Sequence, residues 1–417
     1  MGRITAHPPR VYSRPWARPG HVPKASRFGT AMKKRIVICC DGTWNKRDGD
    51  KPTNVSKLAQ AVPPVGEDGI PQVVFYDQGV GTGAGADRWL GGTFGVGLSR
   101  NVIDAYRFLV DNYSDGGAGG EPDEIFVFGF SRGAFTARSM TGFLRKAGLL
   151  PKHCAEQFPR AYDLYRSDIP VDDPRVVAYR AETGSRDAVV TMLGVWDTVG
   201  ALGIPGHLGQ KFPFRLVNRD YEFHDVQLSS KAVRNAYQAL AIDEERDPFE
   251  PAIWWRRQPA AGAYPQVMEQ RWFAGCHSDV GGGTTTYREA ERDGCLSDVA
   301  LVWMMEKAKA LGLGFDDRYQ REHIHPNPLA RIHDSRRGLG AQMLYRRKVR
   351  EIGLLPNDTA LNAELDRRRA AHPGEPPESL PPPIETNQSL HPSVIQRAAA
   401  TPYNPGNLAR YRARNGE

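Results

Sequence analysis

Short apolar runs recur along the chain from about Lys33 to about Pro328, separated by longer segments that mix apolar and polar residues. The short runs are nearly continuous in hydrophobic residues and of strand length, which is typical of strands buried on both faces of a sheet. The runs that predict strands are Arg35–Cys40, Gln72–Tyr76, Glu124–Phe128, Ala188–Trp196 and Arg271–Ala274.

The longer segments have the spacing of helices. In residues 98–113, apolar residues recur every three or four positions and so fall on one face. The segments that predict helices are Asn54–Val62, Leu98–Tyr113, Arg132–Ala147, Ser230–Leu240 and Leu296–Leu311, the last followed by Gly312, a common helix end. Strands that alternate with helices indicate an α/β fold with a mostly parallel sheet and helices on both faces.

Composition changes at both ends of this pattern. Residues 1–30 are rich in proline and basic residues and predict a disordered tail. Residues 31–330 are predicted to form one α/β domain, and residues 331–417 an irregular C-terminal extension that packs on it. Within the extension, residues 373–383 hold six prolines and predict an extended strap. A chain of 417 residues suits one large α/β domain with such appended segments.

The formal net charge of +7 is distributed unevenly. Nine Lys and Arg and no acid lie in residues 1–35, so the rest of the chain together is slightly acidic. The predicted folded part therefore does not indicate a nucleic-acid partner. The basic tail is expected to be a solvated extension, with peripheral contact to an anionic membrane as the alternative.

The cysteines and the apolar segments bear on the compartment. The five cysteines are scattered, without a pair at zinc-ligand spacing, and favour neither a disulfide framework nor a structural zinc. No apolar run reaches the roughly eighteen residues of a membrane span, and residues 1–30 lack the apolar stretch of a secretory signal. We therefore expect a cytoplasmic protein, with export only through a dedicated secretion system.

One segment has the spacing of a nucleophile elbow. Ser131 lies between Gly129 and Gly133, and glycines at these offsets allow a serine to stand on a strained turn between a strand and a helix. A predicted strand precedes the segment and a predicted helix follows it, as the motif requires. Ser131 is thus the predicted nucleophile of an α/β-hydrolase fold, against the alternative of a small structural residue in a turn.

A serine nucleophile needs a base, and in this fold the acid and then the histidine follow the serine in the chain. His277 lies in a glycine-rich loop after a late strand and is the predicted base, with a histidine satisfied inside a turn as the alternative. Asp197 directly follows the predicted strand Ala188–Trp196 and is the predicted orienting acid. The rival acids are Asp279 and, more weakly, Asp225 beside His224, and Asp243.

The oxyanion of an acyl-transfer intermediate needs two backbone N–H donors. One donor normally belongs to the residue after the nucleophile, here Arg132, and the other to a loop after an early strand. Gly42 and Thr43 follow the first predicted strand and are the candidates for the second donor. This serine route requires no cofactor and no metal ion.

Other motifs fit less well. Residues 39–43 are similar to a phosphatase pattern but have Cys39 where its nucleophilic aspartate should stand. Residues 81–86 match a dinucleotide fingerprint, but glycine-rich sequence continues where a helix is needed, so a mobile loop is expected. Several acids could hold a metal ion together with His277, which leaves a metal-dependent phosphoesterase as the alternative class. These acids are Asp41, Asp77, Asp197 and Asp279.

Four segments, taken together and in this order, resemble a known family. The family is the uncharacterised α/β-hydrolase domain that includes the first class of type VI secretion system phospholipase effectors. The segments are Val37–Asn45, Gly129–Arg138, Gly194–Gly200 and Phe273–Gly283. The likeness runs from about Lys34 to Gly314, and His391–Val394 and Tyr403–Leu408 resemble the family's ending. Gln238 departs from the resemblance, because a histidine is expected there.

The resemblance implies hydrolysis of an acyl ester of a phospholipid, with Ser131, Asp197 and His277 at the matching triad positions. Because fold and triad do not select the ester, carboxylic esters in general are the wider substrate class. A non-catalytic member that uses the fold for binding is a further alternative. The sequence specifies no oligomeric state.

Overall fold

The computed structural model describes residues 33–42, 49–79, 93–117, 119–199, 228, 231–257, 265–336, 345–354 and 384–415. Three predicted segments, besides single candidate residues named below, lie outside these residues. They are the tail of residues 1–30, the glycine-rich loop of residues 81–86 and the proline-rich strap of residues 373–383.

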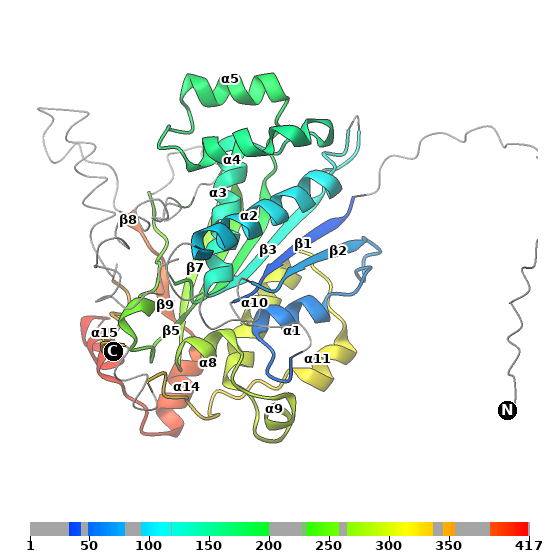
Figure 1. Ribbon diagram of the computed structural model, residues 1–417. Helices are drawn as coiled ribbons and strands as arrows, with labels where there is room; N and C mark the ends of the chain where they lie inside the picture. The colour runs from blue at the N-terminus through cyan, green and yellow to red at the C-terminus, as the bar shows by residue number, and fades with distance from the viewer. Residues whose placement is uncertain are drawn as a thin grey trace, which may run out of the picture.

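A seven-stranded sheet forms the centre of the molecule (Figure 1). Its strand order is β2-β1-β3-β4-β5-β7-β9, and every neighbouring pair is parallel. The strands are β1 (Arg35–Cys40), β2 (Gln72–Asp77), β3 (Glu124–Phe130), β4 (Val190–Trp196), β5 (Val233–Ala241), β7 (Val267–Phe273) and β9 (Gln388–Leu390). A short antiparallel pair, β6 (Arg256–Arg257) and β8 (Ile384–Glu385), lies apart from this sheet. The predicted α/β-hydrolase-like fold is confirmed.

Helices cover both faces of the sheet. One face is covered by α2 (Thr93–Asn112) and α3 (Arg132–Ala147), and α4 (Phe158–Arg166) and α5 (Pro174–Thr183) pack on α3. The other face is covered by α1 (Asn54–Ala61), α8 (His277–Gly281), α10 (Leu296–Ala310) and α11 (Asp317–His323). Three further short helices are η2 (Lys152–Gln157), which packs against α2 and α4, η3 (Asp247–Phe249) and α9 (Tyr287–Asp293). The predicted helices at residues 54–62, 98–113, 132–147 and 296–311 are therefore confirmed.

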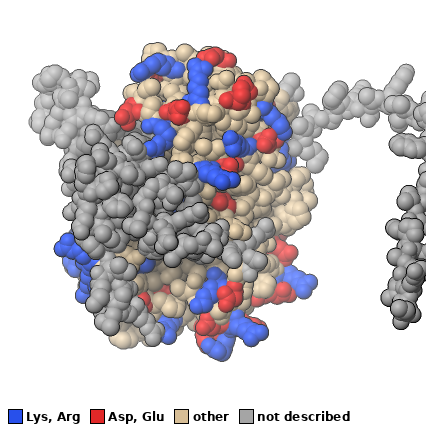
Figure 2. Space-filling model, in the orientation of Figure 1, with Lys and Arg blue, Asp and Glu red and all other residues tan. Residues whose placement is uncertain are grey.

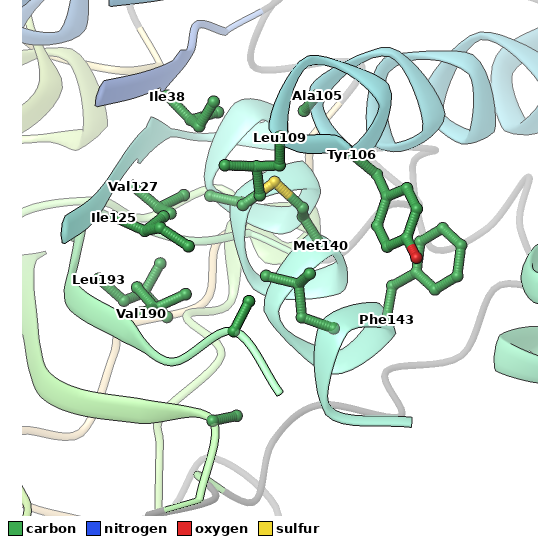
Figure 3. Packing of buried hydrophobic residues seen from close by; sticks show 14 of the residues in the cluster. Ile38, Ala105, Tyr106, Leu109, Ile125, Val127, Met140, Phe143, Val190 and Leu193 are labelled. Carbon is green, nitrogen blue, oxygen red and sulfur yellow. The ribbon is translucent and has the colours of Figure 1, made fainter. Parts of the chain in front are cut away.

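Strand β1 shows how the two layers are built. Its alternate side chains point to opposite faces, so Ile36 and Ile38 pack under α2 and α3, whereas Val37 and Cys39 pack under α1 and α10. Figure 3 shows the first of these layers, in which Ile38 lies near the helix residues that fill the space above the sheet. Burial on both faces explains why these strands are continuous apolar runs.

The helix predicted at residues 230–240 is wrong, because this segment contains β5. Strand β5 pairs with β4 on one side and β7 on the other. Its Ala236 faces the α2 and α3 layer, while Tyr237 and Ala239 face the opposite layer, which is the period of a strand. Small apolar residues fit a buried helix and a doubly buried strand equally well, so periodicity alone could not separate the two structures.

The chain beyond residue 330 completes the sheet. Strand β9 pairs with β7, and it is followed by α14 (Pro392–Ala400) and α15 (Gly406–Asn415). These elements form a third cluster of buried residues with the ends of β5 and β7. The members of this cluster are Leu240, Ile242, Ile253, Trp272, Ile352, Val394 and Leu408. The described part of the predicted irregular extension thus contains β8, β9, α14 and α15, of which β9 joins the central sheet.

Candidate active site

Ser131 stands on a strained turn between β3 and α3. Its backbone has φ 57° and ψ −119°, a conformation that non-glycine residues rarely adopt. A Cβ on Gly129 would lie 2.5 Å from the carbonyl oxygen of Gly133, and one on Gly133 would lie 2.1 Å from that of Cys40. Both glycines are therefore required for the turn to pack against the sheet, as the nucleophile-elbow motif demands.

The parallel sheet brings three chain segments to one edge. Register pairs Phe130 at the end of β3 with Trp196 at the end of β4. It likewise aligns the ends of β5 and β7, through Ala241 and Phe273. Ser131, Asp197 and His277 follow β3, β4 and β7 respectively, so all three lie at the carboxyl edge of the sheet, where open α/β sheets bind their ligands.

Asp197 and His277 are joined by a short hydrogen bond. The distance from His277 Nδ1 to Asp197 Oδ2 is 2.6 Å, and both side chains are buried. The imidazole also contacts the rings of Phe130, the neighbour of Ser131, and Phe249, at centroid distances of 4.6 and 5.1 Å. The ring is thereby held between the elbow and η3. The structure brings together the predicted acid and base beside the turn that holds the predicted nucleophile.

Burial and nearby charges set the protonation of this pair. Burial lowers the pKa of His277, although the contact with Asp197 favours its charged form. Burial opposes ionisation of Asp197, but Arg350 and His277 outweigh it and hold the pKa of that carboxyl below its usual range. A neutral imidazole that donates Nδ1–H to a carboxylate leaves Nε2 as a proton acceptor, which is the form that a general base needs.

Arg350 is a residue of this site that the sequence analysis missed. Its Nη1 donates to Asp197 Oδ1 at 2.6 Å, and its Nη2 donates to Asp197 Oδ2 at 3.0 Å. The backbone N–H of Ala241 donates to Asp197 Oδ1 as well, at 3.0 Å. Arg350 lies beyond the predicted catalytic domain and no motif flanks it, so no local signal could have indicated this contact.

The rival acids have other partners. Asp279 accepts hydrogen bonds from the N–H of Cys276 at 3.0 Å and contacts His333 Nδ1 at 2.5 Å. Asp243 accepts from the N–H of Gly275 and from the hydroxyl of Tyr403. The pair at residues 224 and 225 lies outside the described residues. Of the described candidates, only Asp197 contacts the imidazole of His277.

The candidate oxyanion donors differ in their surroundings. Arg132 is the first residue of α3, where backbone N–H groups lack partners inside the helix. The N–H of Gly42 donates to Asp41 Oδ1 at 2.6 Å, while Asp41 Oδ2 accepts from the hydroxyls of Thr53 and Tyr76. Thr43 lies outside the described residues. In this structure the Gly42 amide is thus engaged by the aspartate next to it.

Gln238 takes part in a buried hydrogen-bond network behind the acid. Its Oε1 accepts from the hydroxyl of Thr198, the residue after Asp197, at 2.9 Å. Its Nε2 donates to Gln270 Oε1 and to the carbonyl oxygen of Ala252. Gln238, at the position where a histidine was expected, therefore supports the turn that follows β4.

The described residues contain neither a candidate metal-ion cluster nor a helix that could span a membrane. No group of three or more histidine, cysteine, aspartate or glutamate side chains in the described ranges lies close enough to hold a metal ion. The acids considered for such a site are engaged separately, Asp41 with Thr53 and Tyr76, and Asp279 with His333. Among the helices in the same ranges, none is long and apolar enough to cross a membrane.

Comparison with known proteins places this site in context. Residues 34–307 match the family described as the catalytic domain of Tle1-like phospholipase effectors of the type VI secretion system. An uncharacterised protein of Saccharomyces cerevisiae is 28% identical over 242 residues, which is 52% of this chain and 32% of that protein. The chain thus spans about a third of the length of this curated relative.

Solved structures show weaker likenesses. An uncharacterised protein from Pseudomonas aeruginosa has a TM-score of 0.45 and 16% sequence identity. The superposition covers 71% of this chain and 49% of that protein's chain. A Tle1 effector bound to the VgrG spike has a TM-score of 0.40 and 18% identity, covering 72% of this chain and 77% of its own. Because both TM-scores are below 0.5, the family assignment rests on the sequence match.

Proposed function

Because the chain belongs to the Tle1-like catalytic-domain family of type VI secretion system phospholipase effectors, we propose that it hydrolyses acyl esters of phospholipids through a serine nucleophile. Membership of this family supports the assignment of a lipolytic hydrolase. The observation that supports the serine route is the 2.6 Å contact between His277 and Asp197 at the sheet edge where Ser131 stands on its strained turn.

In the proposed mechanism, His277 takes the proton of the Ser131 hydroxyl while the serine oxygen attacks the acyl carbonyl. Asp197 holds the imidazole in the required tautomer and stabilises the imidazolium that forms. The tetrahedral intermediate collapses to an acyl-enzyme, and His277 returns its proton to the leaving alcohol, a lysophospholipid when the substrate is a phospholipid. Water activated by the same histidine then releases the fatty acid.

Two backbone donors would stabilise the oxyanion. The Arg132 N–H at the start of α3 is the proposed first donor, because it follows the nucleophile directly. Gly42 could serve as the second donor only by releasing Asp41 Oδ1. Gly42 and Thr43 both stay candidates for this second donor. The route needs no metal ion and no cofactor.

Membrane contact and export belong to the proposal as well. On the face shown in Figure 2, blue and red side chains are interspersed, so its described surface offers no patch of one charge. Contact with an anionic membrane is proposed through the six basic residues among residues 1–30, because Lys33, Lys34 and Arg35 are paired with acids of the domain. Export through a type VI secretion system is proposed from the family alone.

A panel of phospholipids and short-chain esters tests the proposed function, with Ser131→Ala as the control. We expect fatty-acid release by the wild-type protein and none by the variant. A serine-reactive fluorophosphonate probe separates catalysis from binding, because a serine hydrolase is labelled stoichiometrically at Ser131. A folded wild-type protein that neither labels nor releases fatty acid would favour the non-catalytic alternative.

A further inference from the structure

The segment of residues 345–354 approaches the catalytic edge of the sheet from a distant part of the chain. It lies along residues 245–250, where Lys348 N donates to the carbonyl oxygen of Glu245 and Asp247 N donates to that of Arg346. Two arginines of this segment point in different directions, one toward solvent and one into the site. The Arg347 side chain is 62% exposed and pairs with Glu245, whereas that of Arg350 is 4% exposed and pairs with Asp197.

Each terminal nitrogen of Arg350 donates two hydrogen bonds, one to Asp197 and one to a backbone carbonyl oxygen. Nη1 donates to Asp197 Oδ1 and to the carbonyl oxygen of Ala241, at 2.6 and 2.9 Å. Nη2 donates to Asp197 Oδ2 and to the carbonyl oxygen of Phe249. The backbone contacts fix the guanidinium, and the planar fork then fixes both carboxylate oxygens. The carboxylate cannot rotate without breaking this pair of hydrogen bonds.

We propose that Arg350 is a positioning residue of the reaction, which holds the Asp197 carboxylate in the orientation that bonds His277 and offsets part of its negative charge. This inference rests on the proposed function, because it assigns Arg350 a role through the proposed acid and base. Asp197 Oδ2 receives both His277 Nδ1 and Arg350 Nη2. The position of the arginine therefore determines where the imidazole can lie.

The charges that face His277 determine whether loss of Arg350 raises or lowers the pKa of the imidazole. Asp197 contacts its ring, Glu244 accepts its backbone N–H at 3.2 Å, and Arg246 binds Glu244. Asp279, on the same helix, is paired with His333. Glu244 is already balanced by Arg246, so Arg350 is the cation that balances Asp197. Without Arg350, the uncompensated carboxylate would favour the imidazolium, and the pKa of His277 would rise.

A merely structural role would predict a different result. Arg350 also attaches residues 345–354 to the domain, so its loss could reduce activity by loosening that segment. Arg347 is a matched control, because it attaches the same segment through two hydrogen bonds to Glu245, at 2.8 and 2.6 Å, without touching Asp197. Its loss should leave the acid and the base unchanged.

The experiment compares the wild-type chain of 417 residues with its variants Arg350→Met, Arg350→Lys and Arg347→Met. The rate of Ser131 labelling by a fluorophosphonate and the turnover of a short-chain ester are measured across pH. For Arg350→Met we expect a roughly 10- to 100-fold loss of rate from misplacement of the base. We also expect the acid side of its pH–rate profile, which reports the pKa of His277, to move to higher pH by about one unit. Arg350→Lys keeps the positive charge but not the planar fork, so it should be slower than the wild type with an almost unchanged pH–rate profile. Arg347→Met should match the wild type in both rate and profile.

Several results would overturn the inference. An Arg350→Met protein with the wild-type pH profile, or an Arg347→Met protein that is equally impaired, would reduce Arg350 to a structural tether. If Arg350→Met does not fold, the test rests on Arg350→Lys. A lysine variant as fast as the wild type would show that the two hydrogen bonds from the guanidinium to Asp197 are not needed, and would refute the inference. If the wild type itself neither labels nor turns over, the proposed function fails, and titration of His277 by NMR in wild type and variants still tests Arg350. An equal pKa of His277 in all folded proteins would refute its effect.

Discussion

Replacing Asp197 by asparagine tests the assignment of the acid most directly. The carboxylate accepts four hydrogen bonds, from Arg350 Nη1 and Ala241 N at Oδ1, and from His277 Nδ1 and Arg350 Nη2 at Oδ2. An asparagine has only one oxygen, so it can satisfy only one of these two sides. With its oxygen toward Ala241, its amide nitrogen faces His277 Nδ1.

This arrangement would place the imidazole in the wrong tautomer. A donor opposite Nδ1 favours the form with its proton on Nε2, which cannot accept the proton of Ser131. The comparable change in serine proteases lowers kcat by about four orders of magnitude, or about 5 kcal/mol of transition-state stabilisation. We expect Asp197→Asn to lose about that much, and Asp279→Asn to retain most activity because Asp279 pairs with His333.

The assay has to separate catalysis from folding. Asp197→Asn leaves the Arg350 cation without a carboxylate, and breaking a buried pair in this way costs up to about 3–5 kcal/mol of stability. We would therefore measure kcat/KM for a short-chain ester at a temperature well below the melting transition of each variant. If Asp279→Asn proves the more impaired of two folded variants, the acid has to be reassigned to Asp279.

Three further predictions follow from the proposed mechanism. Ser131→Ala and His277→Ala should each lower ester hydrolysis by several orders of magnitude, and the double variant should be hardly slower, because nucleophile and base act as one unit. Either single variant with more than about a tenth of wild-type activity would refute the triad. EDTA should leave turnover unchanged, because backbone donors stabilise the oxyanion; a loss that a divalent metal restores would favour the phosphoesterase. Deleting residues 1–30 should weaken binding to anionic vesicles by on the order of 1 kcal/mol per basic residue at the surface, and flatten its salt dependence. Turnover of a soluble ester should not change, and equal vesicle co-sedimentation of both proteins at low and high salt would show that the tail plays no part.

The elbow could be predicted from the sequence because its determinants are local. The contacts that require Gly129 and Gly133 lie within the turn itself or on β1, the strand beside it. The position of Asp197 could be predicted because a residue after a buried parallel strand must lie at the carboxyl edge of the sheet. In each case a short stretch of sequence determines both the structure and the place of the side chain.

Strand β5 and Arg350 could not be predicted in this way. The small apolar residues of β5 suit two kinds of secondary structure, and only the pairing with β4 and β7 selects the strand. Arg350 and Asp197 are 153 positions apart, and their contact depends on how the chain after α11 returns to the sheet. Both features are decided by tertiary structure, about which a local pattern contains no information.

Asp279 is an intermediate case, in which a better prediction of one element would have removed the rival acid. The glycines around residues 275–283 predicted a loop, but α8 begins at His277 and ends at Gly281. Residues two positions apart on a helix point in different directions and do not face each other. Asp279 accordingly turns away from His277 toward His333, and a carboxylate for the imidazole must come from another element. Asp197, at the end of β4, is the described acid that meets this requirement.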